Sequence, residues 1–67
     1  MDPNATWKAL AEALAAGDWS EAHILAQALR QWLDKGGFPP SATDRAHGRE
    51  ACQHVLELAR VFALGMD

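Results

Sequence analysis

The sequence predicts an all-α protein, a three-helix domain in which an antiparallel helical hairpin carries a longer third helix packed across it. Apolar residues recur at three- and four-residue steps along most of the chain, which is the period of amphipathic helices. Two clusters of helix-breaking residues interrupt this pattern, Gly17-Asp18-Trp19 and Gly36-Gly37-Phe38-Pro39-Pro40. The breaks predict helices at approximately 3–16, 18–34 and 42–64 within one domain that covers residues 1–67.

The first helix has clear start and stop signals. Asp2 can accept hydrogen bonds at the N-cap, and Pro3 suits the first helical position because an N–H is not needed there. Glycine at position 17 can adopt the left-handed conformation that ends many helices. The large apolar side chains between these signals fall on one stripe: Trp7, Leu10 and Leu14.

The second helix follows almost immediately. Asp18 is the predicted N-cap, with Glu21 three residues later as the second arm of a capping box. So short a connection predicts that helices 3–16 and 18–34 form an antiparallel hairpin. The apolar stripe of the second helix is wide enough to need two partners: Ala22, Leu25, Ala26, Leu29 and Leu33.

The third helix is expected to begin after the prolines, with Ser41 as the N-cap and Thr43 as an alternative start. It is expected to end near Gly65. Gly48 is a weak point that predicts either a bend or a close helix contact. At about 1.5 Å per residue this helix would reach about 33 Å, against about 20 Å for the first. The mismatch predicts an apolar end that projects beyond the hairpin.

Composition narrows the classes of protein. The 67 residues carry a formal net charge of −3, and no face is obviously basic, so we expect no nucleic-acid partner. No apolar run approaches the roughly 18 residues that cross a bilayer, so we expect no membrane partner. A single cysteine, Cys52, and a polar start without a secretory segment favour the cytoplasm.

No residue pattern predicts an enzyme or a cofactor. Cys52 falls on the apolar stripe of the third helix, where a thiol acts as a small hydrophobic group. His47, Glu50 and His54 lie at steps of three and four residues on one helical face, and they are the only candidate metal ligands. An exposed polar face explains them as well. They also define the alternative function, a metal- or small-ligand-binding helical bundle that uses this histidine and glutamate cluster across a dimer interface.

The remaining hypothesis is a non-enzymatic interaction or assembly module, which acts as a homodimer or with another protein. A small domain without a disulfide or a metal needs good packing or self-association. The candidate interaction surface consists of Trp32, Phe38, Val55 and Phe62. For Phe38 there is an alternative, in which its ring folds back to close the open end of the hairpin while the prolines set the turn.

The segment from Leu14 to Ala22, with the sequence LAAGDWSEA, resembles the turn of a tetratricopeptide repeat, and the resemblance extends over residues 7–33. It implies that Trp19 packs across the two helices and Ala22 lies at their closest approach, in a peptide-binding or assembly role. Ala26 departs from the family pattern, which has a large aromatic residue there, and the repeat does not recur. The wider pattern is similar to that of small bacterial helical proteins, a likeness that brings no function with it.

Overall fold

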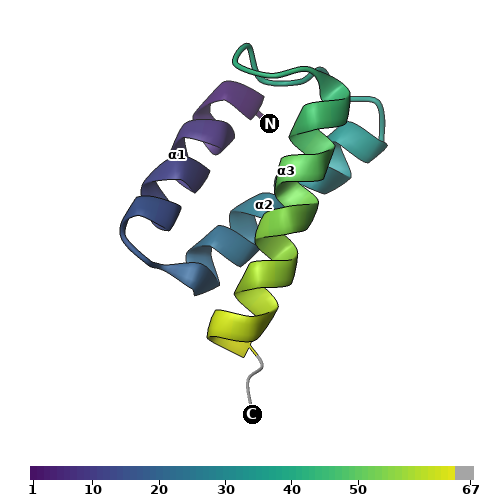
Figure 1. Cartoon of the computed structure of the whole chain (residues 1–67). Coiled ribbons are helices and arrows are strands. Elements are labelled where there is room, and N and C mark those ends of the chain that lie inside the picture. The colour runs from purple at the N-terminus through teal and green to yellow at the C-terminus, as the bar shows by residue number, and fades with distance from the viewer. Residues whose placement is uncertain (65–67) are drawn as a thin grey trace.

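The computed structural model describes residues 1–64 and confirms the all-α, three-helix architecture (Figure 1). The helices are α1 (Pro3–Ala15), α2 (Trp19–Asp34) and α3 (Arg45–Ala59). A five-residue π-helical turn, η1 (Arg60–Leu64), continues α3. The predicted end at Gly65 lies outside the described residues.

The hairpin of α1 and α2 is built by one compact turn. Gly17 takes the left-handed conformation, with φ at 71°. Its N–H bonds to the carbonyl of Leu14 at 3.1 Å, and the N–H of Asp18 bonds to the carbonyl of Ala13 at 2.9 Å, the two bonds of a Schellman motif. Asp18 also caps α2, because its carboxylate accepts the N–H of Glu21 at 3.1 Å. One residue thus ends α1 and starts α2, which confirms the predicted hairpin.

The core lies on both sides of α2. Ala22, Ala26 and Leu29 are fully buried, and the α2 stripe joins Leu10 of α1 and Cys52 of α3 in one cluster. Both α1 and α3 pack against α2, but within the described residues no Cα atom of α1 lies within 8 Å of one in α3. Figure 1 shows α1 and α3 as separate rods that are joined through α2. The second helix is therefore the central helix of the domain.

The end of α2 is fixed to the start of α3 by polar contacts. Gly36, with φ at 95°, forms a second Schellman turn. Arg45 donates to the carbonyl of Leu33 at 2.6 Å and so places its charge at the negative end of the α2 dipole. Arg49 pairs with Asp34 at 2.6 Å. These contacts set the position at which α3 leaves the connecting loop.

The predicted start of the third helix is wrong by three residues. Asp44, not Ser41, is the N-cap, and its carboxylate accepts the N–H of His47 at 2.7 Å. Ser41 instead donates its backbone N–H to the side chain of Asn4 at 2.7 Å, which ties the loop to the beginning of α1. The helix starts late because this segment is held by α1.

Gly48 does not break the third helix. It is buried, and a Cβ atom at this position would lie 3.2 Å from Leu33 and 3.3 Å from Thr43. Of the two predicted outcomes, the close helix contact is therefore confirmed. Taken alone, α3 has 15 residues, one fewer than α2, and η1 supplies the additional length.

We predict that Gly37→Ala destabilises the protein by about 1–3 kcal/mol. The added Cβ would overlap the indole ring of Trp32, which donates to the carbonyl of Phe38 at 2.8 Å. Chemical denaturation of both proteins measures the change. In a Trp32→Leu background the same substitution should have a smaller effect, and an equal effect in both backgrounds would contradict the proposed overlap.

Candidate functional site

An apolar groove runs between α1 and α3, where the two helices diverge from α2. It consists of two adjoining hollows, of about 270 and 630 Å³, which share Leu14, Ala51 and Val55. The groove is lined by eleven residues: Trp7, Leu10, Ala11, Leu14, Trp19, His47, Glu50, Ala51, His54, Val55 and Leu58.

The floor of the groove is made of core side chains. Leu10 is 3% exposed and Val55 is 8% exposed, so both belong to the packed interior and only their outer edges line the groove. Trp7 and Leu14 form the α1 wall and pack against the same core. The small side chain of Ala51 leaves room on the α3 wall. This floor offers no side-chain donor or acceptor for chemistry, but it offers apolar contact.

An aromatic pair lies at the end of the groove where α2 begins. The rings of Trp19 and Phe62 are stacked, with centroids 5.1 Å apart and an angle of 25° between planes. Phe62 still exposes 62% of its surface, and Leu58, one turn earlier, is also exposed. The π-helical turn η1 packs against α2 and carries Phe62 to this position. The groove therefore ends in accessible apolar surface.

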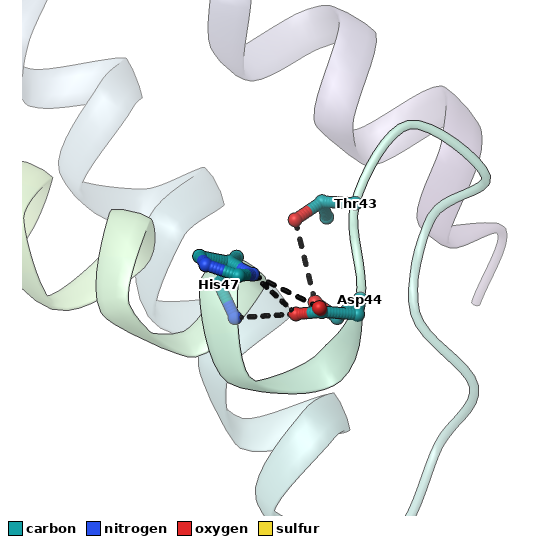
Figure 2. Close-up of polar contacts among 3 residues, drawn as sticks. All are labelled: Thr43, Asp44 and His47. Atoms are coloured by element: carbon teal, nitrogen blue, oxygen red, sulfur yellow. Dashed lines mark hydrogen bonds and ion pairs between the residues drawn. The ribbon is translucent and has the colours of Figure 1, made fainter.

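Asp44 and His47 form a hydrogen-bonded pair at the start of the α3 wall (Figure 2). His47 Nδ1 lies 2.8 and 2.9 Å from the two carboxylate oxygens of Asp44, which also accepts the backbone N–H of His47. That backbone N–H, and then the imidazole, lower the pKa of Asp44. The side-chain hydrogen bond to Asp44 in turn raises the pKa of His47. The pair secures the first turn of α3.

The predicted metal ligands do not form a metal site within one chain. His47, Glu50 and His54 all line the groove, but seven residues of helix separate the two histidines by about 10.5 Å. Within residues 1–64, no group of three or more His, Cys, Asp or Glu side chains is placed to hold a metal.

The four predicted interaction residues do not form one surface. Val55 is 8% exposed and packs in the core, so it contributes only an edge to the groove floor. Phe62, in η1, is exposed and lies beside Trp19 at the start of α2, whereas Trp32 lies near the end of α2. The 13 residues from Trp19 to Trp32 correspond to about 20 Å of helix. Trp32 and Phe62 therefore belong to separate regions.

Phe38 and Trp32 contact each other near the end of α2. Their rings meet edge-to-face, with centroids 5.6 Å apart, and Phe38 exposes 59% of its surface. The ring of Phe38 therefore folds back onto α2, as in the alternative, but it is too exposed to close the open end of the hairpin. Trp32 itself is half-buried.

Sequence reasoning missed the groove itself. Trp7, Leu10 and Leu14 were assigned to the core stripe, but two of them, Trp7 and Leu14, are only half-buried because α3 does not close over α1. One signal was available in the sequence, since the groove side of each wall carries an alanine, Ala11 on α1 and Ala51 on α3. Small residues at both positions leave the space between the helices unfilled.

A separate polar hollow, of about 220 Å³, lies on another side of the domain between α2 and α3. Arg30 donates to the side-chain carbonyl of Gln53 and pairs with Asp34 at 3.6 Å. Gln53 donates to Glu57 at 3.2 Å. Arg30, Gln53 and Glu57 thus already have polar partners within the chain, so the apolar groove is the better candidate for a binding site.

Cys52 has no accessible thiol. It is fully buried between α2 and α3, and this burial raises its pKa to about 11, although the charge of Arg30 acts in the opposite direction. A nucleophilic cysteine needs the reverse, an exposed thiol with a lowered pKa.

We predict that the thermal midpoint responds to pH through the Asp44 and His47 pair. The contribution of His47 is present below its ordinary pKa of 6.5 and is lost as the pH rises through the raised folded value. The contribution of Asp44 is present above 3.8 and is lost as the pH falls through its lowered folded value. The pair therefore stabilises the fold most between these limits.

Calorimetry at about pH 5 and about pH 8 tests this prediction. The stabilising contribution of His47 should raise the thermal midpoint at the lower pH and be absent at the higher pH. His47→Gln should remove that contribution while leaving the other titrating groups in place. The same pH dependence in both proteins would contradict the assignment to His47.

We also predict that Cys52 reacts with thiol reagents only when the protein opens. At about pH 8, the rate at which Cys52 exchanges with an aromatic disulfide should be limited by unfolding of the protein. It should be far below the rate at which an accessible thiol reacts. The chain in concentrated guanidinium provides the reference rate. Rapid and complete reaction of the native protein would show that the thiol is accessible.

No helix within the described residues is long and apolar enough to cross a membrane. Comparison of the chain with protein-family models, with curated proteins and with solved structures finds no match. The candidate site therefore rests on its geometry alone.

Proposed function

We propose that this protein is a small non-enzymatic interaction module that binds one amphipathic α-helix of another protein in the groove. The observation that carries the proposal is the separation of α1 from α3, which leaves an apolar surface with a packed floor open between them. Such surfaces commonly receive the apolar face of a helix. We place this activity in the cytoplasm, because a reducing compartment suits a protein whose single cysteine is an unpaired thiol.

The dimensions of the groove suit a helix. Its α3 wall extends from His47 to Leu58, which is about 16 Å or three helical turns. A partner helix with apolar residues at three- and four-residue steps would place one anchor on each turn. The exposed rings and methyl groups of Leu58 and Phe62 would extend that contact by another turn.

A single helix fits better than a second copy of the chain. A twofold dimer brings identical surfaces together, and two concave grooves would leave a void between them. A standard interface also uses about 20–30 residues on each side, whereas about a dozen line the groove.

The total surface of one chain supports the same choice. The accessible surface is 4170 Å², and the scaling for a monomer of 7.3 kDa gives about 4200 Å². A single chain therefore has no excess surface that self-association must cover. The resemblance of residues 7–33 to a peptide-binding repeat points in the same direction.

The three tryptophans provide a direct test. In a ¹H–¹⁵N NMR titration with a helical peptide of about 14 residues, with leucine at every third or fourth position and alanine and glutamine elsewhere, we predict shifts of the indole signals of Trp7 and Trp19. The signal of Trp32 should stay fixed, because its indole is bonded to Phe38 outside the groove. Equal shifts of all three signals would contradict groove binding.

Two variants of α3 make the test specific. Ala51→Gln puts a longer side chain into the groove and should weaken peptide binding about tenfold, whereas Ala46→Gln, an exposed position outside the groove, should not. Light scattering without peptide decides between partners. A doubling of mass, accompanied by shifts of Trp7 and Trp19 with concentration alone, would show that a second copy occupies the groove.

A further inference from the structure

The charges around α3 are distributed unequally between its two sides. Among the described residues that line the groove, Glu50 is the only acidic side chain. No lysine or arginine lines the groove. In the part of the chain that the structure describes, no ion pair of Glu50 lies within 4.0 Å. Its carboxylate is therefore available to a partner.

The arginines of the domain lie elsewhere. Arg45 caps α2, Arg49 pairs with Asp34, and Arg60 lines the polar hollow between α2 and α3. Glu50 lies on the crest of α3, because it borders both the groove and a shallow hollow that contains Arg49. Arg49 is already paired with Asp34 and does not pair with Glu50. The carboxylate of Glu50 therefore borders the groove without a cationic side chain in direct contact.

We infer that the groove selects an amphipathic helix with lysine or arginine on the flank that faces α3, and that Glu50 is the side chain that makes this selection. The inference rests on the proposed function. The floor supplies apolar contact that any leucine-rich helix can use, so it does not discriminate by charge. A charge at the rim changes the association rate and the choice of partner more than it changes the total affinity.

The neighbouring groups favour a basic flank as well. The net charge of the chain is −3, which attracts a basic segment at long range. The imidazole of His47 is held by Asp44, so the nearest cationic group on this wall already has a carboxylate partner. An acidic partner helix would meet the carboxylate of Glu50, and no lysine or arginine lines the groove to offset the repulsion.

Two matched peptides test the inference. Both carry the same leucine anchors, and they differ only in having lysine or glutamate at two positions on one flank. Fluorescence anisotropy should show that the lysine peptide binds about tenfold more tightly at low salt. The difference should shrink at about 0.5 M salt, where exposed charges are screened. Glu50→Lys should reverse the preference.

Glu12→Lys is the matched control, because it changes the net charge by the same amount at an exposed position of α1 that does not line the groove. It should keep the preference for the lysine peptide. If both peptides bind wild type equally and move the indole signals of Trp7 and Trp19, the charge inference is overturned and the proposed function stands. If neither peptide moves those signals, both are overturned.

Discussion

The packing stripe of α2 is the constraint on which the rest of the structure depends. Ala22 and Ala26 are fully buried, and their small side chains let neighbouring helices approach α2 closely. Leu29 and Leu33 continue the stripe towards α3. Because one helix supplies the contact surface for both α1 and α3, those two helices need not touch each other. This arrangement leaves the apolar groove open between α1 and α3.

The two sides of α3 differ in their contacts. The side next to α2 is fixed by Arg45 at the end of α2 and by the Arg49 pair with Asp34. These bonds hold the direction of α3 without covering its other side. The groove side carries Ala51 and Val55 over the core, with polar residues only along the crest. The polar contacts on one side thus leave a formed surface on the other, which would reduce the entropy lost if the proposed helix binds there.

Much of the fold could be predicted from local signals. Capping by Asp2 and Asp18 and termination at Gly17 are decided within a few residues, so the first two helices lie within one residue of their predicted ends. The start of α3 depends on a bond between Ser41 and Asn4, which are 37 positions apart. Sequence spacing contains no information about such a bond. The late helix start followed from that contact.

The candidate site was less predictable for the same reason. Spacing placed Val55 on an apolar stripe, but which part of a stripe is covered depends on the position of the neighbouring helices. Likewise, His47, Glu50 and His54 were correctly expected to share one face, and they do line one groove. A common face is not enough for a metal site, because within residues 1–64 no group of three or more His, Cys, Asp or Glu side chains is placed to hold an ion.

The attachment of α1 has a consequence for the dynamics of the domain. Among residues 1–64, no Cα atom of α1 lies within 8 Å of one in α3, so α1 is attached mainly to α2, which it joins through the single turn at Gly17. The Ser41 bond to Asn4 ties its start to the loop before α3. Opening of α1 would therefore leave the α2 and α3 pair in contact, and it would remove one wall of the groove. A ligand that touches both walls must favour the docked position of α1. Binding and the local stability of the first helix are in this way thermodynamically linked, so each strengthens the other.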